Sequence, residues 1–221
     1  MQLLMRQVKQ LILHEIRIEL KNKQALGSLV VYSVSSIYIS YLAFRQNIDP
    51  VTWNALFWII MLFAATNAVA KSFLQESKGI QLYYYTLLNA RAVILAKIIY
   101  NILLLTTLGL LNFLCYWILF NTVIADPIQY LLGIFLGSMG LSAILTLVSG
   151  LVSRANNSAS LVAILGFPLL FPLLISILKF SKNAMDGFGW YVNQPYFIIL
   201  ISLNIAVILL SYLLFPYLWR E

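Results

Sequence analysis

The chain has 221 residues, of which 62% are hydrophobic and 10% are charged, whereas about a quarter of the residues in soluble domains are charged. This composition excludes an ordinary soluble protein and predicts an integral membrane protein. The net charge of +7 comes from basic residues that flank apolar runs, so it indicates orientation in a membrane and attraction to anionic lipid rather than nucleic-acid binding.

The N-terminal segment, residues 1–25, has the pattern of an amphipathic helix. Its apolar residues share one helical face: Leu4, Val8, Leu11, Ile12 and Ile18. Its polar and basic residues form a stripe on another face: Arg6, Gln10, His14, Arg17 and Lys21. Such a helix next to a span is expected to lie in the membrane interface, and its scattered charges indicate no cleavable signal peptide. Glu15 and Glu19 interrupt the basic pattern; they favour either local pairing, such as Glu19 with Lys23, or contact with a cytoplasmic partner.

Six apolar runs are long enough to cross a bilayer, which takes roughly 20 residues. They cover about residues 26–44, 52–70, 98–120, 128–152, 158–178 and 196–218. No soluble domain fits between them. The sequence therefore predicts an all-α membrane protein with six transmembrane helices, in which residues 1–221 form a single transmembrane domain.

Residues 71–97 separate the second and third spans and are rich in tyrosine. From Gly79 onward, apolar and aromatic residues share one helical face: Ile80, Tyr83, Tyr84, Leu87 and Leu88. Gln81, Tyr85 and Asn89 form a separate, uncharged polar stripe. A helix that needs only lipid contact more often carries Lys and Arg on its polar side, and tyrosines suit a protein interface. The pattern favours a short helix that binds another protein, with a plain interfacial connector as the alternative.

The fourth span is rich in small residues, which let helices approach closely and form interhelical hydrogen bonds. Gly133 and Gly137 form a G-x-x-x-G motif. A second face carries hydroxyl side chains: Ser138, Ser142, Thr146 and Ser149. These residues predict tight helix packing, either within the chain or at the seam of a homodimer.

The fifth span contains Pro168 and Pro172, each of which removes a hydrogen bond from the helix and predicts a kink or hinge. The following segment, 179–195, is expected to be a loop with a short re-entrant or interfacial piece. Trp190 and Tyr191 would then lie at the lipid headgroups.

Lys and Arg are distributed unevenly between the two sides of the predicted topology. Residues 1–25, 71–97, 153–157 and the C-terminal tail hold eleven of them, whereas the loops 45–51, 121–127 and 179–195 hold Arg45, Lys179 and Lys182. Basic residues accumulate on the cytoplasmic side. Both termini and the segment 71–97 are therefore expected in the cytoplasm.

Sequence motifs of catalysis are absent from the chain. It has no G-x-x-x-x-G-K-[ST] phosphate loop, no H-E-x-x-H motif and one cysteine, Cys115. We therefore expect no enzyme activity, no catalytic residues and no metal site. The spans contain almost no ionisable residue, which disfavours an ion-coupled carrier. His14, the only histidine, is expected to be a polar-face residue rather than a haem ligand.

The order of elements resembles the six-span permease subunits of ABC-2 type exporters, and three local features resemble the haem exporter protein B family (CcmB). The first is Glu76–Ser77–Lys78–Gly79–Ile80 followed by Leu95–Ala96–Lys97. The second is the double-proline run from Pro168 to Pro172, and the third is the turn Val152–Ser153–Arg154 after the small-residue span.

This resemblance implies a permease subunit of the bacterial inner membrane that acts in haem export or delivery for cytochrome c maturation. A separate ATP-binding subunit would hydrolyse ATP and dock on the cytoplasmic coupling helix, at Glu76, Lys78, Gly79, Gln81, Tyr84, Tyr85 and Asn89. Further implied partners are other maturation membrane proteins, a haem chaperone that could dock on 179–195, and a second copy of the chain. No cofactor is expected to be bound directly; haem would be a transported or handed-over ligand. An ABC-2 exporter of another lipid-linked or amphipathic substrate and a non-transporting membrane scaffold remain alternatives.

Overall fold

A computed structural model describes residues 2–21, 23–44, 48–69, 89–120, 124–152 and 159–220. Within these ranges the chain forms seven helices and no strand. They are α1 (Gln2–Lys21), α2 (Lys23–Phe44), α3 (Pro50–Val69), α6 (Ala90–Phe120), α7 (Pro127–Val152), α8 (Ala159–Met185) and α9 (Trp190–Arg220). Six of the seven, all except α1, are long and apolar enough to cross a membrane. The predicted all-α architecture with six spans is therefore confirmed.

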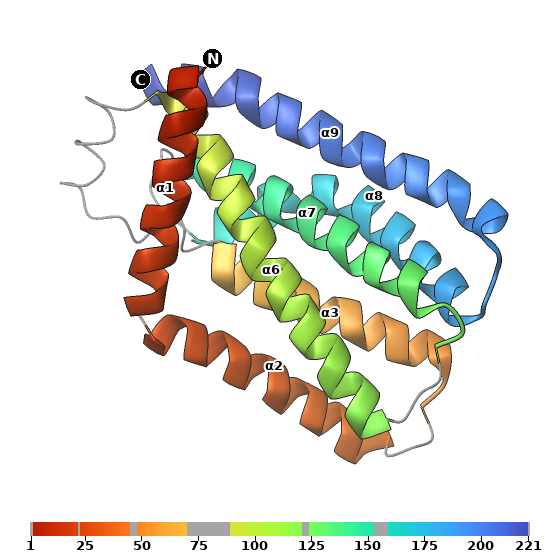
Figure 1. The fold of residues 1–221 in the computed structure, drawn as a ribbon. Coiled ribbons are helices and arrows are strands. Elements are labelled where there is room, and N and C mark those ends of the chain that lie inside the picture. Colours follow the sequence, from red (N-terminus) through yellow and green to blue (C-terminus); the bar gives the residue numbers. More distant parts are fainter. Residues whose placement is uncertain are drawn as a thin grey trace.

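The spans lie side by side and alternate in direction, so both chain termini lie at the same end of the bundle (Figure 1). Helix α1 lies crosswise at that end, next to the beginnings of α2 and α6 (Figure 1). Its burial follows the predicted amphipathic pattern. Leu11 is buried and Val8 and Ile12 pack against the core, whereas Arg6, Gln10, His14 and Arg17 are exposed. Ile18 departs from the pattern, because its side chain is 43% exposed.

Helix α7 is the central span. In its most apolar window 78% of the residues are buried, compared with 17% in α2. It packs most extensively against α6, α8 and α9. Glycine and serine along α7 permit this position, because a helix with large side chains could not have close neighbours on so many sides.

An aromatic cluster joins α3 to α6 and α7. Trp53 and Phe57 of α3 contact Tyr116 of α6 and Tyr130 of α7 edge to face, with ring centroids 4.9–5.8 Å apart. Edge-to-face pairs of this kind stabilise packing beyond the area they bury. All four side chains are fully buried.

Polar residues just before the helices satisfy the free N–H groups of their first turns. The Thr52 N–H donates to Asp49 Oδ2 at 3.0 Å. The Thr52 hydroxyl, and after it this N–H, hold the pKa of the Asp49 carboxyl below its usual value. The Gln129 N–H donates to Asp126 Oδ1 at 3.0 Å in the same way. These caps fix the beginnings of α3 and α7.

Two helices extend beyond the predicted spans into the segment predicted as the loop 179–195. Helix α8 continues to Met185 and α9 begins at Trp190, so only residues 186–189 form the connection. Gly187 adopts φ 75°, a left-handed conformation that glycine adopts without strain. The prediction that all of 179–195 is a loop was therefore wrong, because only residues 186–189 lie outside a helix. An apolar run marks the part of a helix that crosses lipid, and a helix can continue beyond it into water. Lys182, in the last turn of α8, forms an ion pair with Asp186 in the connection.

Candidate functional site

The predicted partner-binding segment lies mostly outside the described residues. This applies to Glu76, Lys78, Gly79, Gln81, Tyr84 and Tyr85. The structure does describe the helices on either side of the segment. The C-terminal end of α3 and the N-terminal end of α6 both lie at the end of the bundle where α1 crosses (Figure 1). We therefore take this end, which we call the α1 end, as the candidate functional site.

Asn89 directly precedes α6 and caps it. Its side-chain Oδ1 accepts a hydrogen bond from the Arg91 N–H at 3.0 Å, and its carbonyl accepts from the N–H groups of Ala92 and Val93. Asn89 is exposed, so it remains accessible to a partner. Helix α6 thus begins at Ala90, whereas the sequence placed the start of the third span near residue 98.

The first turns of α6 are buried although they precede the predicted span. Ala92, Ile94 and Ala96 are at most 1% exposed, and the Lys97 side chain is 2% exposed. Lys97 was assigned to the cytoplasmic segment, where a lysine is normally solvated. The structure instead places it inside the bundle, because α1 covers this part of α6.

Lys97 forms an ion pair with α1. Its Nζ lies 3.1 Å from Glu15 Oε1, and Glu15 is 18% exposed. A buried charge needs a partner, because removing it from water costs several kcal/mol. Glu15 therefore pairs with a residue far away in sequence rather than with a neighbour on α1. The sequence analysis missed this pair. The signal that could have indicated it is a lysine in an otherwise apolar helical stretch, Ile94 to Ile99.

The beginning of α6 also contacts α9, the C-terminal helix, through Arg91. The Arg91 guanidinium carbon lies 4.9 Å from the centroid of the Tyr212 ring on α9, a cation–π distance. Helix α6 is thus joined to α1 through Lys97 and to α9 through Arg91. The α1 end is a connected unit of three helices.

Below this end, polar side chains join α6 to α7. The Ser142 hydroxyl donates to the Ile98 carbonyl at 3.0 Å, and the Asn101 amide donates to the Thr146 hydroxyl at 2.9 Å. All of these polar side chains are buried. In membrane proteins such bonds contribute about 0.6 kcal/mol each on average. The predicted hydroxyl face of the fourth span therefore contacts α6 of the same chain.

The small residues Gly133 and Gly137 also pack within the chain. A Cβ on Gly137 would lie 2.4 Å from the Trp58 ring of α3 and 3.2 Å from Ile177 of α8. A Cβ on Gly133 would lie 3.2 Å from the Phe180 ring. Ser138 is fully buried. Of the two uses that the sequence left open, the described structure shows packing within one chain at these positions.

Pro168 and Pro172 lie inside α8, and both are exposed on its surface. The Ser176 hydroxyl donates to the Pro172 carbonyl at 2.8 Å. The helix continues through both prolines. A functional hinge at these residues stays a prediction.

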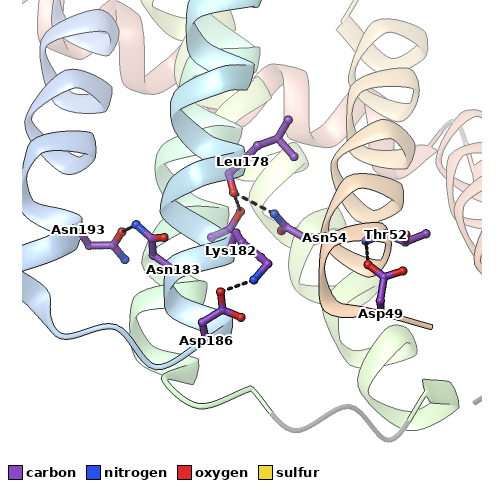
Figure 2. A network of polar contacts seen from close by, with 9 residues as sticks. Asp49, Thr52, Asn54, Leu178, Lys182, Asn183, Asp186 and Asn193 are labelled. Atoms are coloured by element: carbon purple, nitrogen blue, oxygen red, sulfur yellow. Dashed lines mark hydrogen bonds and ion pairs between the residues drawn. The ribbon is translucent and has the colours of Figure 1, made fainter. Parts of the chain in front are cut away.

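The end opposite α1 is joined by a chain of amide side chains. Asn183 of α8 donates to Asn193 of α9 at 3.0 Å, and Asn54 of α3 donates to the Leu178 carbonyl at 3.0 Å (Figure 2). Asn193 in turn donates to Gln129 of α7 at 2.7 Å. These contacts hold the turn at 186–189 in place, and next to it Trp190 and Tyr191 are 44% and 87% exposed.

Within the described ranges, no three His, Cys, Asp or Glu side chains form a group that could hold a metal ion. His14 is exposed on α1.

The sequence matches the family model described as CcmB protein over residues 6–218, which is nearly the whole chain. A search of curated proteins gives no significant match. The CcmB family implies a haem-exporter permease subunit of the ABC type, a membrane component of cytochrome c biogenesis that is not itself an ATPase. The chain belongs to the CcmB protein family.

Proposed function

We propose that the chain is the membrane permease subunit of an ABC complex that delivers haem for cytochrome c maturation in the bacterial inner membrane. A separate ATP-binding subunit docks at the α1 end, on the coupling segment 71–97. A second copy of the chain, other maturation membrane proteins and a haem chaperone complete the complex. Haem is handed over or transported and is not a resident cofactor. The family match over residues 6–218 carries this proposal.

The charge distribution supports a cytoplasmic α1 end. Both termini lie on one side of the bundle, together with the C-terminal end of α3 and the N-terminal end of α6 (Figure 1). The segments predicted on that side hold eleven of the fourteen Lys and Arg residues of the sequence. Positively charged segments are retained in the cytoplasm. This orientation exposes the coupling segment to a soluble ATPase.

The contacts of α6 provide a route from the docking segment into the bundle. Residues 90–97 form the first turns of α6, and all of them except Arg91 and Leu95 are buried. Helix α6 packs against α1, α7 and α9. A displacement at the start of α6 would therefore move α1 through Lys97–Glu15 and α9 through Arg91–Tyr212. Packed interfaces transmit such displacements because they resist continuous deformation.

Co-purification with candidate ATP-binding subunits tests the docking site. In the test variant, Gln81→Glu is combined with Tyr85→Glu, and Asn89 is left intact because its side chain caps α6. We expect the ATPase to be lost from the purified complex, because two carboxylates replace uncharged contact groups. The matched control is Gln194→Glu with Tyr191→Glu, the same replacements on exposed residues of the opposite end.

The control complex should retain its ATPase, and both variants should elute as monodisperse protein in size-exclusion chromatography. Retention of the ATPase by the Gln81/Tyr85 variant would contradict the proposal that the ATPase docks on segment 71–97. Equal loss from both variants would also contradict it, because the effect would then not depend on the end of the bundle that was changed.

A further inference from the structure

Helices α3, α6 and α7 meet at a buried junction near the middle of α7. All three helices pack against one another. Gly109 of α6 marks the junction, because a Cβ at this position would lie 3.2 Å from Met61 Cε of α3 and 3.6 Å from Ser138 Oγ of α7. The Ser138 hydroxyl therefore points across to α6. No contact of the functional proposal uses this junction.

The Ser138 hydroxyl is fully buried and has no hydrogen-bond partner among the described residues. Other buried serines bond to a carbonyl of their own helix: Ser181 donates to the Ile177 carbonyl at 2.6 Å, and Ser211 donates to the Val207 carbonyl at 2.8 Å. Ser138 is different because its hydroxyl is turned toward the neighbouring helix. An unpaired hydroxyl in a span is costly, since lipid and apolar side chains offer no hydrogen bond in place of water.

Asn112 brings a second unpaired group to the same junction. It lies three residues after Gly109 on α6 and is fully buried. Its Nδ2 donates to Met61 Sδ at 3.3 Å, which is a weak acceptor, and its Oδ1 has no partner among the described residues. Met61 thus contacts Asn112 through its sulfur and approaches Gly109, next to Ser138, through its methyl group. The two unpaired oxygens therefore belong to one three-helix contact.

The contact between α6 and α7 on the α1 side of this junction is made by direct hydrogen bonds, from Asn101 to Thr146 and from Ser142 to the Ile98 carbonyl. At the junction, by contrast, the facing groups need a ligand between them. Asn112 Oδ1 only accepts hydrogen bonds, whereas the Ser138 hydroxyl can donate one. Water both accepts and donates, and buried water typically bonds to polar groups that are otherwise unsatisfied.

From these two unpaired groups on facing helices, we propose that the junction of α3, α6 and α7 binds a water molecule. The water accepts a hydrogen bond from the Ser138 hydroxyl and donates one to Asn112 Oδ1, so it takes the place of a direct bond between α7 and α6. The two helices can separate at this point without breaking a hydrogen bond between protein groups. The junction is therefore where α6 moves relative to α7 with the least loss of such bonds.

Met61 provides a local readout, because its side chain is 0% exposed and its sulfur contacts Asn112. The full chain in detergent receives a short X-ray pulse in buffer that contains a radical scavenger. X-rays convert bound water into hydroxyl radicals at its site, and mass spectrometry then measures oxidation of each methionine. The unchanged chain is compared with Ser138→Ala and with Ser142→Ala. Ser142 is the matched control, because it lies one turn away on α7 and bonds directly to protein.

We expect oxidation of Met61 in the unchanged chain and in Ser142→Ala, and a fall to the background level in Ser138→Ala. All three proteins should elute as monodisperse protein. Met5, which is 66% exposed, reports radicals from bulk water, and the scavenger should suppress its oxidation. Absence of Met61 oxidation in the unchanged chain, or its suppression together with that of Met5, would overturn the site. Equal oxidation of Met61 in the two serine variants would also overturn it.

The measurement uses the chain without an ATPase, so its result is independent of the docking proposal.

Discussion

Lys97 shows how a single residue can connect two elements that the sequence keeps apart. Its side chain is 2% exposed, so its charge is stable there only with a partner, and Glu15 of α1 supplies one at 3.1 Å. The pair contributes little net free energy compared with an apolar pair of the same size, because both charges lose water. Its effect is specificity, since α1 can satisfy Lys97 in one position along α6.

Replacement of Lys97 tests this pairing. Lys97→Met leaves Glu15 without its partner, and we expect a loss of about 2 kcal/mol in unfolding free energy, less than for a fully buried pair because Glu15 retains some contact with water. The double variant Lys97→Met with Glu15→Gln should recover most of this loss. Unfolding by denaturant in detergent micelles, followed by circular dichroism, measures both. Additive losses in the double variant would show that the two side chains are not coupled.

Among the elements, α7 has the most constrained packing, and Gly137 is the clearest example. The indole of Trp58 occupies the space that a side chain at residue 137 would need, and the Trp58 Nε1 donates to the Ser181 hydroxyl at 2.9 Å. That hydrogen bond prevents the ring from moving away easily. Helices α3, α7 and α8 therefore meet at one point.

Gly137→Ala should destabilise the bundle by about 2 kcal/mol, because the new methyl group overlaps a ring that is held in place. Gly27→Ala is the matched control: it lies in the span helix α2, and a Cβ there meets nothing within 4 Å. Alanine has the higher helix propensity, so the control should be unchanged or slightly more stable. Thermal unfolding in the same detergent compares the two variants, and equal midpoints would contradict the described packing of α7.

At the scale of the whole molecule, the two ends of the bundle have different compositions. The α1 end carries the crosswise basic helix, the ion pair and the flanks of the coupling segment. The opposite end carries the amide chain and exposed aromatic residues, Trp190 and Tyr191, which suit the headgroup region. A bilayer that crosses the six spans must therefore place these two surfaces on opposite sides.

Labelling with a membrane-impermeant maleimide tests which side is cytoplasmic. Single cysteines are introduced as Gly189→Cys in the α8–α9 turn and as Gln10→Cys on α1, in a chain in which Cys115 is replaced by serine. In intact cells whose outer membrane has been permeabilised, we expect labelling at residue 189 and none at residue 10. Both positions should react after lysis. The reverse pattern would overturn the orientation and, with it, the proposed docking of a cytoplasmic ATPase.

The sequence by itself determined the class, the number of spans, the amphipathic face of α1 and the placement of both termini at the same end. These features depend on the local length and period of apolar residues, which a chain carries without reference to its neighbours. The coupling residues from Glu76 to Tyr85 remain predictions from the sequence, because they lie outside the described residues.

Only the tertiary structure determined which residues and helices of the chain contact one another. In the structure Lys97 pairs with Glu15, and the Trp58 ring lies against Gly137. The hydroxyl face of α7 contacts α6 of the same chain, and a groove lies between α1, α2 and α6. The structure also places the beginning of α6 at Ala90, inside a stretch that the sequence assigned to the cytoplasm. The physical reason is that burial depends on which helices approach one another. In a chain where nearly every helix is apolar on all sides, periodicity contains little information about which face meets protein and which meets lipid.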